Sequence, residues 1–212
     1  MTNLTKGLAS LGTIGAATGG GILIKNKLSS GEKEISVSRR LTKEGYTLLN
    51  ASVDAEWNTT LEKHKSDQIK HPKFQPTSSD LRALQEACKS ILRKTEVSED
   101  DYKKAKKWCV KPVSVRELIK AKNKNLLDVD KSGDENKGEW QKLSERYEKE
   151  GKGSKAIEGL TIPPSSGKTE DDWKQLRTKC KELADKDFWS DKYDEELDKV
   201  IMWCTSESNS AI

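Results

Sequence analysis

The chain has 212 residues, of which 33% are hydrophobic and 35% are charged, and its formal net charge is +4. Such a polar composition leaves little apolar surface to offset the conformational entropy lost on folding, so a large hydrophobic core is excluded. The chain has six tryptophans and apolar residues at helical spacing, which argue against a fully disordered chain and predict a fold with a thin core.

The first predicted element is an N-terminal membrane segment. Residues 7–24 carry no charge and are bracketed by lysines. This stretch is just long enough to cross the hydrocarbon core, so the sequence predicts a transmembrane helix that anchors the chain within residues 1–28. A cleaved signal peptide is the alternative, because the small residues 15–17 suit a signal peptidase.

The rest of the chain repeats one series of landmarks, which divides it into a first helical repeat, 29–122, and a second, 123–212. Each repeat contains, in the same order, a Leu-Leu pair, a Glu-Trp pair, a Leu-x-x-x-Cys stretch, a Tyr and a Trp-Cys pair. In the first repeat these are Leu48-Leu49, Glu56-Trp57, Leu84 to Cys88, Tyr102 and Trp108-Cys109. In the second they are Leu126-Leu127, Glu139-Trp140, Leu176 to Cys180, Tyr193 and Trp203-Cys204. The distances between landmarks vary, as expected if the differences lie in loops.

Both repeats carry amphipathic helix patterns around their cysteines. Apolar residues recur at i, i+3, i+4 and i+7 in four stretches, which are 81–92, 102–109, 173–183 and 193–204. Ser98, Ser114 and Thr169 are each followed three positions later by an acidic residue, which is typical of helix N-termini. No stretch shows sustained period-two alternation. The sequence therefore predicts an all-α fold in which each repeat contains a helical hairpin.

The four cysteines are predicted to form one disulfide in each repeat. Each hairpin carries one cysteine on the inner face of either arm, so antiparallel arms bring Cys88 near Cys109 and Cys180 near Cys204. Closing a loop of about 20 residues stabilises a fold by roughly 3 kcal/mol in the chain-entropy model. Disulfides would place the domain in an oxidising exterior. The alternative is that the cysteines are buried thiols packed on helix faces.

The charges that flank the membrane segment favour the opposite location. More basic residues follow the segment than precede it, and the positive-inside rule then favours a cytoplasmic C-terminal part. In that orientation the basic cluster 103–108 would contact anionic lipid. The acidic residues 99–101 adjoin this cluster and weaken its field, so nucleic acid is not a favoured partner. The lysines of the cluster are expected to form the solvated face of a helix.

Several stretches resemble the large paralogous families of uncharacterised membrane-anchored proteins in haemotropic mycoplasmas. They are Leu4 to Gly12, Ser36 to Leu41, and Trp108 to Val110 with Ser114 to Leu118. The resemblance implies a protein of the cell membrane whose C-terminal domain is extracellular. It implies a role in binding, with a host surface ligand as a possible partner, or in antigenic display. The family has no established activity that could be carried over.

The sharpest candidate site is a calcium loop over residues 128–139. Calcium prefers a wrapping of hard oxygen ligands, with glycine at the sixth position of a twelve-residue loop and glutamate at the twelfth. The candidate ligands are Asp128, Asp130, Ser132, Asp134 and Glu139, with Asn136 at the ninth position. Glu135 stands at the eighth position, where an apolar residue is usual, and the chain has no second loop of this kind. The alternative interpretation is a polar linker and no cofactor.

No catalytic residues are predicted, so the chain is not expected to be an enzyme. Each cysteine lies on an apolar stripe, unlike the accessible, electropositive setting of a reactive thiol. The two histidines, His64 and His71, are interpreted as surface residues rather than metal ligands.

Overall fold

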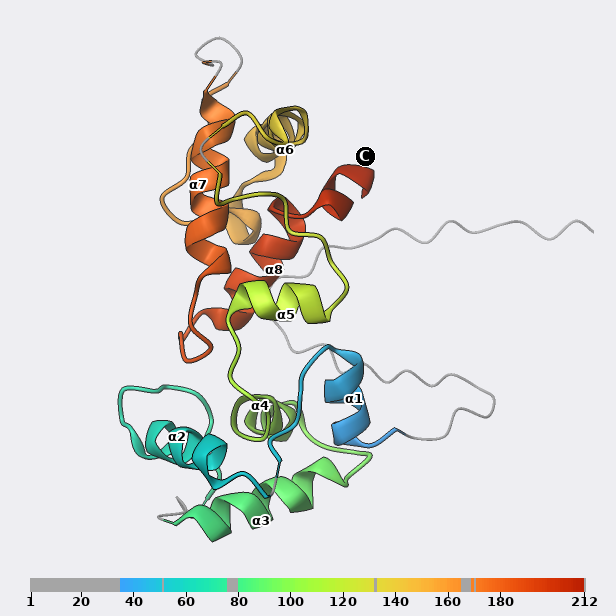
Figure 1. Cartoon of the computed structure of the whole chain (residues 1–212), viewed down its shortest axis with the longest axis vertical. Helices are drawn as coiled ribbons and strands as arrows, with labels where there is room; N and C mark the ends of the chain where they lie inside the picture. The colour runs from blue at the N-terminus through green and yellow to red at the C-terminus, as the bar shows by residue number, and fades with distance from the viewer. Residues whose placement is uncertain are drawn as a thin grey trace, which may run out of the picture. The chain divides into compact units, whose positions relative to one another are not determined.

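The computed structural model describes residues 35–50, 52–75, 80–131, 133–164, 169 and 171–211. These residues form α-helices joined by loops and short 3-10 helices, and the predicted all-α class is confirmed (Figure 1). The α-helices are α1 (Val37–Lys43), α2 (Asp54–Lys65), α3 (Leu81–Leu92), α4 (Glu99–Trp108), α5 (Val115–Ala121), α6 (Lys137–Glu150), α7 (Asp172–Ala184) and α8 (Tyr193–Trp203). The 3-10 helices are η1 (Gly153–Lys155) and η3 (Ser206–Ala211).

The predicted membrane anchor lies outside the described residues. Within the ranges given above, no helix is long and apolar enough to cross a membrane. Residues 7–24 are not among those ranges, so the anchor stays a prediction.

The helices form two groups, each closed by its own disulfide. Helices α1 to α4 pack on one another, and α5 to α8 form a second group (Figure 1). Cys88 of α3 is bonded to Cys109, which follows α4, and their Cα atoms lie 5.4 Å apart. Cys180 of α7 is bonded to Cys204, which follows α8, with Cα atoms 5.7 Å apart. The structure thus pairs the cysteines as the sequence predicts.

The helices around the cysteines bury the apolar stripes that the sequence shows. In α3 the buried residues are Leu84, Cys88 and Ile91. Asp80 caps this helix by accepting a hydrogen bond from the Ala83 amide at 2.8 Å. Capping satisfies one of the free amide groups at a helix start, so α3 begins where its buried stripe begins.

The two groups make the same contacts around their Trp-Cys pairs. Trp108 donates an indole hydrogen bond to the Pro72 carbonyl at 2.6 Å, and Trp203 donates one to the Lys155 carbonyl at 2.9 Å. Both tryptophans are fully buried. Each indole hydrogen bond therefore links a loop in the middle of its helix group to the end of the cysteine hairpin of the same group.

A short extended contact accompanies each disulfide. Leu48 pairs with Val110 in one antiparallel bridge, and Leu126 pairs with Thr205 in another. These isolated bridges lie directly after Cys109 and Cys204. They join the residues that follow each hairpin to a Leu-Leu pair that precedes it.

Helix α5 packs with the second group, although the sequence-based boundary between residues 122 and 123 assigns it to the first. Its contacts are with α7 and α8. The start of α5 corresponds to the start of α1, because Ser36 and Ser114 both accept a hydrogen bond from an amide three residues later. The turns that follow also correspond, since Gly45 and Asn123 both have positive φ angles, +89° and +54°.

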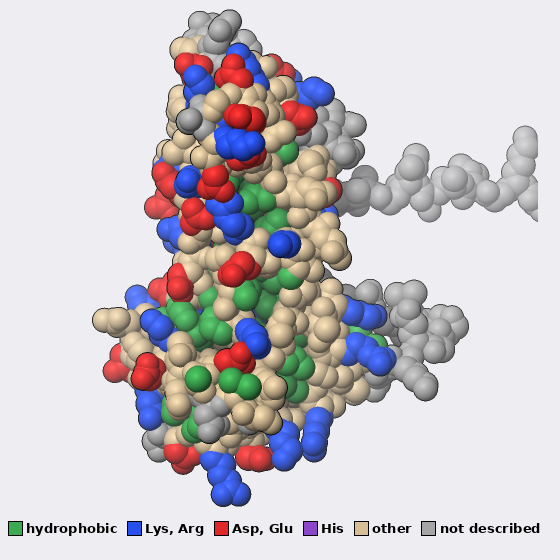
Figure 2. All heavy atoms as spheres, viewed as in Figure 1, with side chains coloured by type: hydrophobic (Ala, Val, Ile, Leu, Met, Phe, Trp, Pro, Cys, Tyr) green, Lys and Arg blue, Asp and Glu red, His purple; other side chains and the backbone are tan. Residues whose placement is uncertain are grey.

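The surface of the described residues is polar. Among them, Val53 is the only exposed large hydrophobic side chain. Figure 2 shows Lys and Arg interspersed with Asp and Glu over the face in view. Such mixing is typical of solvated helix faces.

Candidate functional site

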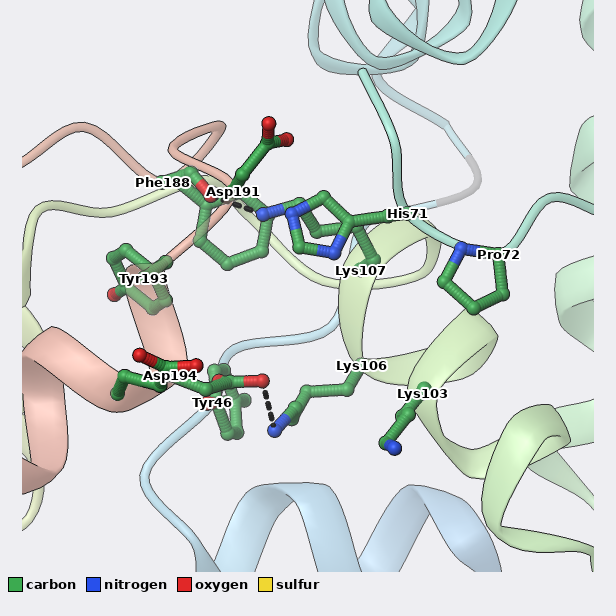
Figure 3. A pocket seen from close by; sticks show the side chains of 11 residues that line it. Tyr46, His71, Pro72, Lys103, Lys106, Lys107, Phe188, Asp191, Tyr193 and Asp194 are labelled. Atoms are coloured by element: carbon green, nitrogen blue, oxygen red, sulfur yellow. Dashed lines mark hydrogen bonds and ion pairs between the residues drawn. The ribbon is translucent and has the colours of Figure 1, made fainter. Parts of the chain in front are cut away.

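A cavity of about 300 Å³ lies where the two helix groups meet. Helix α4 supplies one side of it, and the segment from Phe188 to the first turn of α8 supplies the other (Figure 3). His71 and Pro72, from the loop after α2, and Tyr46, from the turn after α1, complete the lining. The cavity thus draws on four separate parts of the chain.

Contacts between aromatic residues hold the two sides of this cavity together. The rings of Trp108 and Trp189 stack with centroids 5.7 Å apart. Phe188 meets Trp189 and Tyr193 edge to face, with centroids 5.0 and 5.1 Å apart. Tyr193 also donates a hydrogen bond to the Val113 carbonyl at 2.9 Å. Pairs at these distances add favourable interaction beyond the area that they bury.

Lys107 crosses from α4 into this aromatic cluster. Its side chain is only 6% exposed. The ammonium lies 4.5 Å from the ring centroid of Phe188, 5.5 Å from that of Tyr193 and 5.6 Å from that of Trp189. It donates a hydrogen bond to the Phe188 carbonyl. Cations at these distances from aromatic faces are attracted by the ring quadrupole.

Burial changes the acid–base properties of Lys107. Removal from water disfavours the charged amine and lowers the pKa of Lys107 to about 8, although the nearby Asp194 and Asp187 favour the charged form. The prediction that all lysines of the 103–108 cluster are solvated is therefore wrong for Lys107. The physical reason is that the aromatic rings and a carbonyl replace part of its hydration.

Charges of both signs surround the mouth of the cavity. Lys106 and Asp194 form an ion pair at 2.7 Å, drawn as a dashed line in Figure 3. Lys103, Asp191 and Glu195 also line the cavity. The mouth can therefore interact with an anionic group and with a cationic group at the same time.

Neither histidine is an ordinary surface residue. His64 is fully buried, and its ring meets Trp108 edge to face at 4.7 Å. His71 lies at the cavity and forms a hydrogen bond to the Ser190 carbonyl at 3.2 Å. Burial lowers the pKa of both side chains. The surface interpretation is thus wrong for His64, because Trp108 and Phe74 cover its ring.

The candidate calcium loop holds its carboxylates in other contacts. Asp130 receives two hydrogen bonds from Arg116, at 2.8 and 3.3 Å, and an ion pair from Lys181 at 3.1 Å. Asp128 accepts hydrogen bonds from the amides of Asp130 and Lys131. A bound calcium ion would have to displace the cations from Asp130.

The remaining predicted ligands do not gather in the described residues. Asp134 lies 3.8 Å from the Lys137 ammonium. Asn136 accepts a hydrogen bond from the Asp128 amide, and Ser132 lies outside the described residues. No cluster of three or more His, Cys, Asp or Glu that could hold a metal occurs in the described part of the chain. Calcium binding by residues 128–139 stays a prediction.

One signal in the sequence indicates that Lys107 is buried, and the expectation of a fully solvated lysine face misses it. Lys107 directly precedes the Trp108-Cys109 pair, and Met202 directly precedes Trp203-Cys204. An apolar residue at the matching position of the second landmark series indicates that this position faces inward. Nothing comparable points to His71, Phe188 or Asp191.

Comparison of the chain with protein-family models, curated proteins and solved structures gives no match.

Proposed function

We propose that the chain is a membrane-anchored, surface-exposed helical protein that acts by binding or antigenic display rather than by catalysis. The observation that carries this proposal is the disulfide buried in each helix group. Disulfides form and persist in oxidising exteriors and are rare where thiol reductants act. In this proposal residues 7–24 anchor the chain and the rest is the ectodomain.

The ectodomain in this proposal consists of two copies of one helical module. The paired disulfides, the indole hydrogen bonds of Trp108 and Trp203, and the two extended bridges support this. The capped starts of α1 and α5 support a second copy that begins at Ser114 rather than at residue 123. The resemblance to the paralogous proteins of haemotropic mycoplasmas belongs to the same proposal.

A role in binding is supported by the cavity at Lys107. It combines aromatic walls with charged groups of both signs, which is the composition of a site that holds a ligand by non-covalent contacts. The site also lies between two disulfide-closed groups, so its walls are held in place before a ligand arrives.

The test is labelling of intact cells with a membrane-impermeant amine reagent, followed by mass spectrometry of the modified lysines. Lys63 and Lys142 are exposed and should be labelled in intact cells. Lys107 is buried and serves as an internal control, since it should react only after the domain is denatured. Protection of Lys63 and Lys142 until the cells are lysed would contradict the proposal and favour a cytoplasmic, lipid-contacting protein.

A second measurement checks the same proposal through the cysteines. Alkylation of intact cells before and after reduction should show that all four cysteines become reactive only after reduction. Four cysteines that are alkylated without reduction, in lysates prepared with the alkylating reagent present, would contradict an exterior location.

A further inference from the structure

The buried ammonium of Lys107 has hydrogen-bonding capacity left over. A lysine ammonium has three N–H donors. In the described part of the chain, the Phe188 carbonyl is the one acceptor that Lys107 reaches. Lys107 lines the cavity, and in Figure 3 its amine lies between Phe188 and His71, which also line it. A buried cation with unused donors favours an anionic group placed in this cavity.

Negatively charged groups are available at the mouth of the cavity. Asp191 lines the cavity, is exposed, and forms no hydrogen bond or ion pair with another described residue. Asp194, by contrast, is engaged by Lys106 at 2.7 Å. Asp191 and Glu195, which is also exposed, are therefore the carboxylates at the mouth that form no ion pair with another described residue.

Apolar surface lies between these two charges. Phe188 and Tyr193 are almost fully buried and line the cavity together with Tyr46 and Pro72. A volume of about 300 Å³ suits a small molecule rather than a peptide or a nucleotide. A fitting ligand is compact and has an apolar frame.

We propose that this cavity binds a small zwitterion of the free amino acid class, with its carboxylate at Lys107 and its ammonium at Asp191. The apolar frame of the ligand then lies against Phe188 and Tyr193. This inference deepens the proposed role in binding and rests on it.

Lys107 and Asp191 together favour a zwitterion over a singly charged ligand. A simple carboxylate would satisfy Lys107 but would leave Asp191 without a cationic partner from the ligand. A simple amine would satisfy Asp191 but would meet the buried positive charge of Lys107. A ligand with both groups gives Lys107 an anionic partner and Asp191 a cationic one.

Three probes that share one frame separate these possibilities. L-phenylalanine has both charged groups, hydrocinnamate has only the carboxylate and phenethylamine has only the ammonium. Calorimetric titration of the purified full-length chain in detergent, with probe up to about 10 mM, covers weak binding. L-phenylalanine should bind at least about tenfold more tightly than either analogue, because each lost contact involves a charged group.

Two variants assign the charged groups of the probe to residues. Lys107→Met should weaken L-phenylalanine binding about tenfold or more and leave phenethylamine binding unchanged or stronger. Asp191→Asn should weaken L-phenylalanine binding by a similar factor and leave hydrocinnamate binding unchanged or stronger. Lys104→Met and Asp171→Asn make the same chemical changes outside the cavity and should have no effect.

The inference is overturned if L-phenylalanine binds no more tightly than its analogues, if no probe binds, or if the two cavity variants behave like their controls. Circular dichroism and thermal unfolding check that Lys107→Met is folded. If Lys107→Met is not folded, the titrations of Asp191→Asn test the inference by themselves, because Asp191 is exposed and its substitution leaves the core intact. These titrations use purified protein, so a failed cell-labelling experiment and a failed titration are separate results.

Discussion

His64 shows how a single buried side chain ties stability to pH. Its Nε2 accepts a hydrogen bond from the Phe74 amide at 3.3 Å, so Nδ1 carries the proton of the neutral ring. That Nδ1 is buried and has no hydrogen-bond partner. Tyr147 occupies the matching place beside Trp203, at 5.1 Å, and its hydroxyl accepts a hydrogen bond from the Ile157 amide. Tyrosine therefore suits this position, and its hydroxyl, with an ordinary pKa of 10, does not titrate at acid pH.

We expect His64→Tyr to reduce the acid sensitivity of the domain. Burial holds the pKa of His64 below its ordinary value of 6.5, so below pH 6.5 the unfolded chain binds a proton that the folded chain does not. The free energy of unfolding of the wild type should therefore fall as the pH drops below 6.5, by at most about 1.4 kcal/mol per pH unit for each histidine. Urea unfolding at pH 7 and pH 5 measures this slope. An equal slope in His64→Tyr would contradict the prediction. The slope of His71→Gln shows how much of the wild-type pH dependence comes from His71.

Lys107 should make stability rise with pH as His64 does, but at alkaline pH. Its pKa is about 8 when folded and 10.5 ordinarily, so between these values the unfolded chain holds more protons and stability rises with pH. Burial raises the pKa of Tyr46, Tyr102 and Tyr193. These residues therefore lower the stability of the domain only as the pH rises above 10, the ordinary pKa of tyrosine. Unfolding free energies from pH 8 to about 9.5 should therefore rise in the wild type and rise less steeply in Lys107→Met, in which only Lys122, whose pKa burial also lowers, still contributes. A flat wild-type profile would show that Lys107 titrates normally.

The helical hairpins depend on their disulfides for stability because their apolar stripes are narrow. In α4 the buried apolar residues are Tyr102, Ala105 and Trp108, and the other positions are mostly charged. A stripe of this width buries too little surface to hold two arms together by itself. The disulfide at the end of each hairpin therefore carries a large share of the stability of its group.

Removing either disulfide should cost about the same free energy. The cysteines are separated by 21 residues in the first pair and by 24 in the second, and the chain-entropy model gives about 3 kcal/mol for each loop. Urea unfolding of the Cys88→Ala/Cys109→Ala and the Cys180→Ala/Cys204→Ala variants measures the two losses. A pair whose removal leaves stability unchanged would show that the apolar stripes alone hold that hairpin.

The caps of α1 and α5 allow a matched comparison. Ser114 and Glu117 form a reciprocal capping box, in which each side chain binds the other residue's amide. The Ser36 hydroxyl accepts a hydrogen bond from the Arg39 amide at 3.4 Å and contacts the Ser38 hydroxyl at 2.8 Å, and residue 39 is an arginine that makes no reciprocal bond of the capping-box kind. We expect Ser114→Ala to lower the free energy of unfolding by about 1 kcal/mol and Ser36→Ala to lower it by less. Equal losses in urea unfolding would mean that the reciprocal bond adds nothing.

Local patterns in the sequence predict the helices and cysteine pairs but only part of the candidate site. The stripe through Leu84 and Cys88 requires only helical periodicity, which is why the hairpins and their disulfides could be predicted. The cavity depends on contacts such as that of Lys107 with Phe188, which are 81 residues apart in the chain. A charged residue also gives no hydropathy signal for burial. Such contacts follow only from how the two groups pack together.

The two helix groups share an interface that is aromatic at its centre and charged at its edge. Trp108 and Trp189 stack at 5.7 Å in the middle, and the ion pair of Lys106 with Asp194 lies at the rim. Lys107 adds a hydrogen bond across the same interface. The candidate ligand site lies within this interface, so its geometry depends on the two groups remaining in contact.

We therefore expect Trp189→Ala to uncouple the two groups while leaving each one folded. Trp189 is 9% exposed, and losing a buried tryptophan costs roughly 3–5 kcal/mol. Its ring stacks on Trp108 and lies 5.6 Å from the Lys107 ammonium across the interface, whereas the disulfide of each group is retained. Thermal unfolding should change from one cooperative transition to two, with a calorimetric enthalpy that exceeds the van't Hoff enthalpy. Cys180→Ala/Cys204→Ala is the informative control, because it weakens one group without touching the interface. A single transition in Trp189→Ala, shifted only to lower temperature, would mean that the two groups fold as one cooperative unit through their remaining contacts.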